Sequence, residues 1–188
     1  MKTLVVYTHP WEESFNHFVL ETTVSKLEAK GYSVDVIDLH KDGFNPAFTQ
    51  DDLRLFGKGE YHDELAANYI KRVKEADEII FVFPIWWYGM PAMLKGFFDK
   101  VMLKGQAYGE VNHKLTGLLN IQKGAVFTTA SVTEEILKYV GDPIGQTTIN
   151  GIFAMIGIHN VTWIHCATVH LEASRLEYLS KIEAFIGQ

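Results

Sequence analysis

The sequence predicts an α/β fold in which helices cover both faces of a five-stranded parallel sheet. Two observations carry this prediction. Five short apolar runs, rich in β-branched and aromatic residues, alternate with segments of helical periodicity. The run Ile79–Phe83 is apolar without interruption, which is typical of a strand buried on both faces of a sheet. The length of 188 residues favours one domain, which we expect to span residues 1–188.

The predicted strands and helices alternate along the chain. We expect strands at Leu4–Thr8, Ser33–Asp38, Glu78–Phe83, Gly124–Thr129 and Asn160–His165. Between them, apolar residues recur every three or four positions, and we expect helices at Ser14–Lys30, Asp63–Glu75, Pro91–Lys104, Thr147–Ile158 and Arg175–Ile186. Two long connections interrupt this alternation. We interpret residues 41–61 as a surface excursion and residues 105–122 as a lid or a dimer contact.

The loop after the first strand narrows the choice of strand order. Five strands in a chain of this length fit the order 2-1-3-4-5, which is that of a flavodoxin-like three-layer sandwich. The rival Rossmann arrangement would place Gly-x-Gly-x-x-Gly in this loop, but residues 9–16 read His-Pro-Trp-Glu-Glu-Ser-Phe-Asn. No P-loop pattern occurs either. In the favoured order, ligands bind at the carboxyl ends of the strands, where the strand order reverses.

Composition and missing motifs exclude several classes of function. The net charge is −6 and no basic run exceeds two residues, so we expect no nucleic-acid partner. The single cysteine, Cys166, is interpreted as an inert core thiol, and the lack of a disulfide framework is typical of a cytoplasmic protein. No His-x-x-x-His or Cys-x-x-Cys pair occurs, and we expect no metal. The acidic pairs Asp51-Asp52 and Glu134-Glu135 are interpreted as solvated charges.

The loop after the first strand also has the features of a phosphate site. It ends in Ser14-Phe15-Asn16 where a helix begins, and helix N-termini offer free N–H groups and the positive end of the helix dipole. Ser14 and Asn16 add side-chain donors, and His9 offers another. By itself Ser14 would be interpreted as a helix cap only. At the point where the strand order reverses, phosphate binding becomes the better interpretation.

The turn after the third strand is the most informative segment. Residues 84–91 read Pro-Ile-Trp-Trp-Tyr-Gly-Met-Pro. Three consecutive aromatic residues on one short turn cannot all point into one core, so at least one should line a cavity or an interface. Their flat faces suit a planar ligand such as a flavin ring. The hydroxyl-rich segment Thr128–Ser131, after the fourth strand, offers donors for the polar edge of such a ring.

The segment Pro84–Val101 carries a resemblance to a known family. It reads Pro-Ile-Trp-Trp-Tyr-Gly-Met-Pro-Ala-Met-Leu-Lys-Gly-Phe-Phe-Asp-Lys-Val and contains the pattern Pro-x-x-Trp-[Tyr/Phe]-x-x-Pro-x-x-Leu-Lys. Together with His9, Ser14-Phe15-Asn16, Ala107-Tyr108-Gly109 and Thr128-Thr129, it resembles the NAD(P)H:quinone oxidoreductase family of flavodoxin-like flavoproteins. The short bacterial members, which include ancillary reductases of potassium-efflux systems, are the most similar. The resemblance covers nearly the whole chain.

The resemblance implies a bound flavin and assigns residues to it. The segment matching the phosphate end of the cofactor comprises His9, Ser14, Phe15 and Asn16. The segment matching the ring contact comprises Pro84, Ile85, Trp86, Trp87 and Tyr88. A third segment, which is Thr-Thr-Gly-Gly in the family, reads here Thr128, Thr129, Ala130 and Ser131. FMN is favoured over FAD because the chain lacks the long C-terminal extension of the larger members.

The implied activity is hydride transfer from NAD(P)H, through the flavin, to a quinone or a similar two-electron acceptor. No catalytic residue is assigned, and Tyr88 and Tyr108 are candidates for orienting the acceptor. Two alternatives stay open: a flavodoxin-type electron carrier, and a regulatory reductase-like subunit of a membrane transporter. We also expect a homodimer, because the helix Pro91–Lys104 is apolar around much of its circumference.

Overall fold

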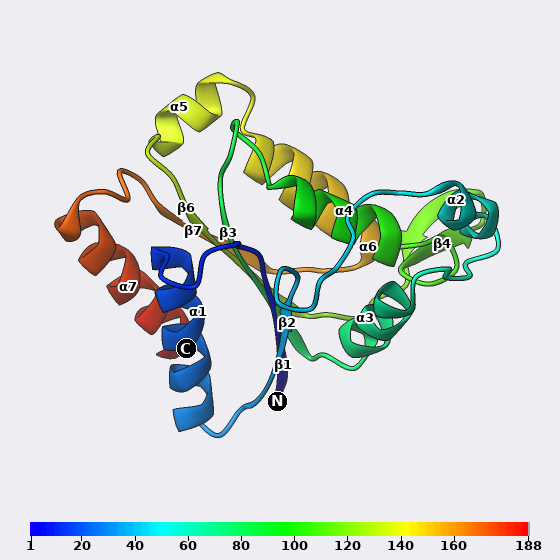
Figure 1. Cartoon of the computed structure of the whole chain (residues 1–188), viewed down its shortest axis with the longest axis horizontal. Coiled ribbons are helices and arrows are strands. Elements are labelled where there is room, and N and C mark those ends of the chain that lie inside the picture. The colour runs from blue at the N-terminus through cyan, green and yellow to red at the C-terminus, as the bar shows by residue number, and fades with distance from the viewer. Residues whose placement is uncertain (188) are drawn as a thin grey trace.

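The predicted sheet is present in the structure, a computed structural model that describes residues 1–187 (Figure 1). Its parallel strands are β1 (Lys2–Tyr7), β2 (Ser33–Asp38), β3 (Glu78–Pro84), β6 (Lys123–Thr129) and β7 (Val161–Cys166). They pair in the order β2-β1-β3-β6-β7. Since β4 and β5 lie outside this sheet, the order is the expected 2-1-3-4-5. All of β3 is buried, as its uninterrupted apolar run predicted.

Helices cover both faces of the sheet (Figure 1). One face is covered by α1 (Phe15–Ala29) and α7 (Glu172–Gly187). The other face is covered by α3 (Glu64–Lys74), α4 (Ala92–Val101) and a continuous helical segment, which comprises the π-helix η1 (Pro143–Phe153) and α6 (Ala154–Ile156). This arrangement is the expected three-layer sandwich. Within residues 1–187, no helix is both long and apolar enough to cross a membrane.

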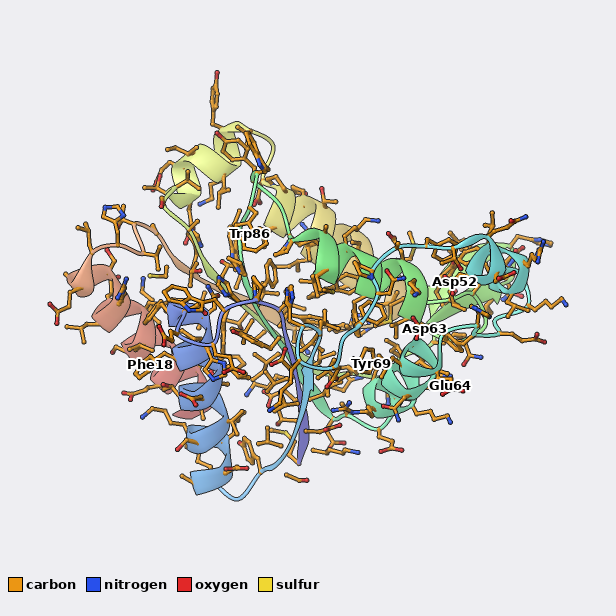
Figure 2. The ribbon with its side chains drawn as sticks, in the orientation of Figure 1. Phe18, Asp52, Asp63, Glu64, Tyr69 and Trp86 are labelled. Carbon is orange, nitrogen blue, oxygen red and sulfur yellow. The ribbon has the colours of Figure 1, made fainter. Side chains whose placement is uncertain are left out.

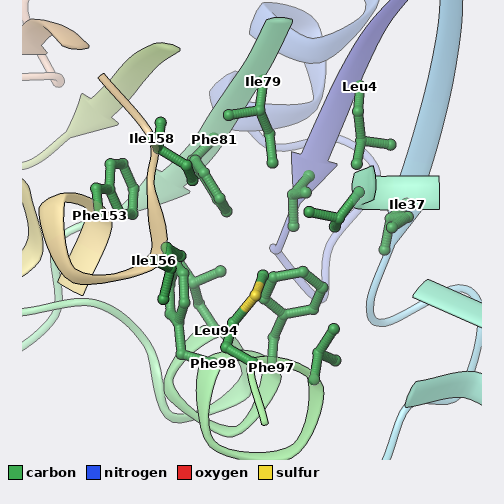
Figure 3. Close-up of a cluster of buried hydrophobic side chains, with 14 of the residues drawn as sticks. Leu4, Ile37, Ile79, Phe81, Leu94, Phe97, Phe98, Phe153, Ile156 and Ile158 are labelled. Atoms are coloured by element: carbon green, nitrogen blue, oxygen red, sulfur yellow. The ribbon is translucent and has the colours of Figure 1, made fainter. Parts of the chain in front are cut away.

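Aromatic rings build the larger of the two cores, on the α4 side of the sheet (Figure 3). Phe81 of β3 lies 5.4 Å from Phe98 of α4 and 4.9 Å from Phe153 of η1, measured between ring centroids. Phe97, Phe98 and Val101 are all buried within the chain. On the same helix, Ala92 is exposed and Met93 is half-buried. One chain thus covers most, but not all, of the apolar surface of α4, and the expected homodimer stays a prediction.

Three short elements were not predicted. They are α2 (Gln50–Phe56), the hairpin of β4 (Tyr108–Val111) with β5 (Lys114–Gly117), and α5 (Glu134–Tyr139). The helix α2 begins with a capping box: Thr49 Oγ1 accepts from the N–H of Asp52 at 3.1 Å, and Asp52 Oδ2 accepts from the N–H of Thr49 at 2.8 Å. The two long connections thus contain secondary structure that a search for core-facing periodicity does not detect.

The connection 41–61 is fastened to α4 by a buried lysine. Lys100 Nζ donates to Asp63 Oδ2 at 2.5 Å and to the carbonyl oxygen of Asn45 at 2.9 Å, and it lies 3.8 Å from Asp52 Oδ2. Asp52 lies on α2, and Asp63 caps the start of α3 (Figure 2). Asp51 is exposed, as expected, but Asp52 is buried. The interpretation of Asp52 as a solvated charge was wrong, because this carboxylate closes the capping box and faces Lys100.

Candidate functional site

Two adjoining cavities open at the carboxyl ends of β1, β3 and β6. The first has a volume of about 320 Å³ and lies between the start of α1 and the loop after β6. The second has a volume of about 460 Å³ and lies between that loop and the aromatic turn after β3. The structure brings all but one of the predicted cofactor-binding residues to these cavities: His9, Ser14, Phe15, Asn16, Pro84, Ile85, Trp86, Trp87, Tyr88, Thr129, Ala130 and Ser131.

Polar groups at the start of α1 make the first cavity suitable for an anion. Ser14 caps the helix, its Oγ accepting from the N–H of His17 at 3.1 Å. Asn16 Nδ2 donates to Thr129 Oγ1 at 2.8 Å and so joins α1 to β6. Asn16 lines the cavity, and its Oδ1 is buried without a hydrogen-bond partner among the described residues. The first N–H groups of a helix lack partners within it, so the cavity offers N–H donors to an anion and one unsatisfied acceptor to a hydroxyl group.

His9 closes one side of the first cavity as a neutral ring. Its Nδ1 accepts from the N–H of Trp11 at 3.1 Å, and its ring meets Trp86 edge-on with centroids 5.9 Å apart. Burial lowers the pKa of His9 below its usual value. The lowered pKa favours the neutral form of the imidazole.

The aromatic turn at the end of β3 (Figure 2) is a strained two-residue hairpin. The N–H of Trp86 donates to the carbonyl of Gly89 at 3.0 Å, and the N–H of Gly89 donates back at 3.1 Å. The two residues between them, Trp87 and Tyr88, have φ values of 49° and 65°. Such type I′ turns favour Asn and Gly, and bulky side chains are strained there. The turn leaves Trp87 96% exposed at its tip, with Trp86 and Tyr88 half-exposed beside the second cavity.

Replacing Trp87 by asparagine is expected to stabilise the apoprotein. Asparagine tolerates positive φ, and an L-residue with a larger side chain costs roughly 1–2 kcal/mol there. We expect the free energy of unfolding to rise by about 1 kcal/mol, which corresponds to an increase in Tm of about 2–4 °C for a chain of this size. Trp87→Ala removes the same exposed ring but keeps the strain, and should change stability by less than about 0.5 kcal/mol. Equal melting temperatures for the two variants would contradict the assignment of strain.

The loop after β6 presents backbone donors to the cavities. The N–H of Ala130 donates to the carbonyl of Cys166 at 3.0 Å, and the carbonyl of Ala130 accepts from the N–H of Val169 at 2.9 Å. Among the described residues, the N–H groups of Ser131 and Val132 make no backbone hydrogen bond. Neither Ala130 nor Ser131 has a positive φ. The backbone here therefore adopts a conformation that does not require the two glycines of the family pattern.

Thr128 is the predicted site residue that lines neither cavity. Side chains alternate across a strand, so Thr129 faces α1 while Thr128 faces the opposite layer. The hydroxyl of Thr128 is fully buried and accepts from Trp163 Nε1 at 2.9 Å. The expectation that its hydroxyl contacts a cofactor is corrected: this side chain supports the sheet beneath the loop.

Tyr88 and Tyr108, the two candidates for orienting an acceptor, are separated in the structure. Tyr88 lines the second cavity. Tyr108 lies on β4 and lines a different, apolar cavity of about 410 Å³, together with Phe98 and Met155. Within one chain, only Tyr88 is placed at the candidate site.

Arg175 is a site residue that sequence reasoning missed. It lies in the first turns of α7 and lines the first cavity. Its Nε donates to the carbonyl of Val169 at 2.6 Å, and its guanidinium carbon lies 5.0 Å from the centre of the Phe15 ring. The arginine adds a positive charge beside the start of α1. No local motif marks it, because the fold alone brings the end of the chain to this loop.

Comparison with known proteins gives a consistent result. The family model described as flavodoxin-like fold matches residues 1–186. An uncharacterized NAD(P)H oxidoreductase of Haemophilus influenzae is 29% identical over 174 residues, which are 91% of this chain and 86% of that protein. Human ribosyldihydronicotinamide dehydrogenase (quinone) is 32% identical over 156 residues, which are 74% of this chain and 68% of that protein.

A solved structure shows that the similarity also holds for the three-dimensional fold. The NAD(P)H:quinone oxidoreductase of Methanothermobacter marburgensis superimposes with a TM-score of 0.89 at 26% identity, covering 99% of this chain and 97% of that one. The match confirms the resemblance drawn from the aromatic turn. The chain belongs to the flavodoxin-like family, among its oxidoreductases of the NAD(P)H:quinone oxidoreductase type.

Proposed function

We propose that this protein is a flavin-dependent NAD(P)H oxidoreductase that passes hydride from NAD(P)H, through bound FMN or FAD, to a quinone or similar two-electron acceptor. One observation carries the proposal. A helix N-terminus with unsatisfied polar groups and a strained aromatic turn line adjoining cavities at the point where the strand order reverses. The names of the relatives agree with this reaction class.

The residues of the first cavity fit the phosphate and sugar-alcohol end of a flavin. The start of α1 would hold the phosphate through its N–H groups, with the Arg175 charge nearby. Asn16 Oδ1, which lacks a partner among the described residues, would accept from a hydroxyl group of the ligand. A site built for a purely apolar molecule would not leave this buried atom unsatisfied.

The residues of the second cavity fit the ring and a second planar molecule. Trp86 and Tyr88 offer half-exposed aromatic faces, while Ser131 and Val132 offer backbone N–H groups on the opposite side. When bound, a flavin accepts hydride from a nicotinamide and delivers two electrons to an acceptor. The contribution of the protein is to orient both rings and to place N–H donors where negative charge accumulates. No proton donor is assigned.

FMN is our preferred cofactor, and the structure supplies a way to compare it with FAD. A third cavity of about 540 Å³ adjoins the first and lies between α1 and α7, where Phe18 and Leu176 line it. The adenosine half of FAD would have to lie there. Comparable affinities for FMN and FAD would show that the third cavity contributes nothing to binding.

Flavin titration followed by turnover tests the proposal. The apoprotein is mixed with FMN, FAD and riboflavin, and binding is followed by quenching of flavin fluorescence. The loaded protein is then supplied with NADPH or NADH, and with a simple benzoquinone as acceptor. Flavin binding with NAD(P)H-dependent quinone reduction supports the proposal. A protein that binds no flavin, or that reduces only one-electron acceptors from another donor, would contradict it, and the second result would favour the electron-carrier alternative.

The remaining expectations about partners stay predictions. A homodimer is tested by sedimentation equilibrium, and the exposed aromatic rings of Trp87 and Tyr139 are the first surfaces to examine for burial. A cytoplasmic location and a membrane-transporter partner are tested by cell fractionation and co-purification.

A further inference from the structure

A hydrogen-bonded chain of three side chains lies behind the loop that separates the two cavities. His165 of β7 lies directly opposite Thr128 of β6 in the register of the sheet. His165 Nδ1 is 2.9 Å from Thr128 Oγ1. The same Thr128 oxygen accepts a hydrogen bond from Trp163 Nε1 at 2.9 Å. His165 Nε2 is 2.9 Å from the carbonyl oxygen of Val132. This hydrogen-bond network therefore extends from Trp163 to the cavity-lining loop.

The partners fix where each proton lies. A carbonyl oxygen can only accept, so His165 Nε2 carries a proton and donates to Val132. In a neutral ring Nδ1 is then an acceptor, and the hydroxyl of Thr128 donates to it. The oxygen of Thr128 in turn accepts the indole N–H of Trp163. Every donor has one acceptor, and the network is complete only with neutral His165.

This network holds one end of the loop, and the backbone of β7 holds the other. Ala130 is fixed through its N–H and its carbonyl, which pair with Cys166 and Val169. Val132 is fixed through its carbonyl by His165. The N–H group of Ser131 lies between these two fixed residues, and the N–H group of Val132 belongs to the second of them. Neither makes a backbone hydrogen bond among the described residues.

We propose that neutral His165 is a positioning residue that clamps the loop 130–132, so that the N–H groups of Ser131 and Val132 stand at the edge of the second cavity. The proposal rests on the proposed function, since the ligand at that edge is the flavin ring. The residue acts through Val132 and does not line either of the two cavities itself.

The surroundings of His165 favour its neutral form. Burial is the main cause that lowers the pKa of His165, while the hydrogen bond to Val132 and the charge of Glu134 oppose it. A further polar cavity of about 310 Å³ lies beside the ring, and its remaining titratable lining consists of Glu134 and Glu135 from α5, Cys166 from β7, and Glu177, Tyr178 and Lys181 from α7. Once protonated, Nδ1 can no longer accept from Thr128, but Nε2–H still donates to the carbonyl of Val132. Because burial lowers the pKa of His165, the neutral ring persists below the ordinary histidine pKa of about 6.5. The hydrogen bond from Thr128 is lost only as the pH falls through that lowered pKa, whereas the hold on Val132 remains.

Two substitutions test the clamp in the flavin-loaded protein. His165→Phe keeps a buried ring but removes both hydrogen bonds. His165→Gln keeps an amide N–H donor for Val132. We expect flavin affinity to fall about tenfold in His165→Phe at pH 7.5 and less than threefold in His165→Gln. Unchanged affinity in His165→Phe, or an equal loss in both variants, would overturn the proposal.

A further measurement separates this proposal from other causes. In the apoprotein, hydrogen exchange of the indole N–H of Trp163 and of the amide N–H of Ala130 should be at least tenfold faster in His165→Phe than in wild type. Unchanged exchange overturns the clamp even if flavin binds. Faster exchange in a protein that binds no flavin supports the clamp and overturns the proposed function alone.

Discussion

Replacing Lys100 by methionine is expected to lower the free energy of unfolding by about 3 kcal/mol, because it leaves the buried carboxylate of Asp52 and the half-buried carboxylate of Asp63 without their cation. Asp63 and Asp52 face Lys100 Nζ at 2.5 and 3.8 Å. Methionine fills the volume of the lysine stem but offers no donor to either carboxylate or to the carbonyl of Asn45. The connection 41–61 would lose its attachment to α4.

Urea denaturation provides the measurement, with the slope compared between proteins to verify that both unfold in one step. Lys95→Met is the matched control, because Lys95 lies on the same helix and pairs with Asp99 at 2.5 Å on the exposed surface. An exposed pair contributes less than about 1 kcal/mol. The assignment of Lys100 as the anchor fails if both variants lose the same small amount of stability.

Replacing Asn16 by aspartate is expected to weaken FMN binding by about 2–4 kcal/mol, which is roughly 30-fold to 1000-fold in the dissociation constant. The substitution preserves size, and the hydroxyl of Thr129 can donate to the new carboxylate in place of the present hydrogen bond from Asn16. The apoprotein should keep its stability, since a carboxylate is favourable in the first turn of a helix. The new charge would, however, repel the phosphate at the start of α1.

Riboflavin, which has no phosphate, distinguishes repulsion from misfolding. We expect riboflavin affinity to change less than about threefold in Asn16→Asp, because the repulsion acts only on a charged ligand. Asn120→Asp adds the same charge at an exposed position in the connection 105–122 and serves as control. Equal losses for FMN and riboflavin would show that the first cavity does not receive the phosphate.

The topology was predictable because many residues contribute to the same pattern. The uninterrupted run Ile79–Phe83 is fully buried in β3. Gly31, which follows the C-cap residue of α1, has a φ of 79°. The start of α1 and the aromatic turn were placed correctly for a related reason. Each follows directly from the end of a strand, and strand ends meet at one edge of a parallel sheet.

The errors concern side chains whose surroundings come from distant parts of the chain. Thr128 and Thr129 are equivalent in the sequence, and only the alternation along β6 decides which one reaches the cavity. Asp52 appeared solvated because its cation, Lys100, lies on a different helix. His165 carried no motif, because Thr128 and Val132 become its partners only when β6 and β7 pair.

The pairing of β7 with β6 has a consequence for the order of events in biosynthesis. The loop 130–132 obtains its shape from Cys166, His165 and Val169, and Arg175 completes the first cavity. The earlier parts of the site, near Asn16 and Trp86, are synthesised long before these residues. A nascent chain truncated before β7 thus contains the helix start and the aromatic turn but lacks one wall. The complete site can therefore form only after the last strand has been synthesised. Ligand binding would indicate that the chain has been synthesised through α7 and has folded.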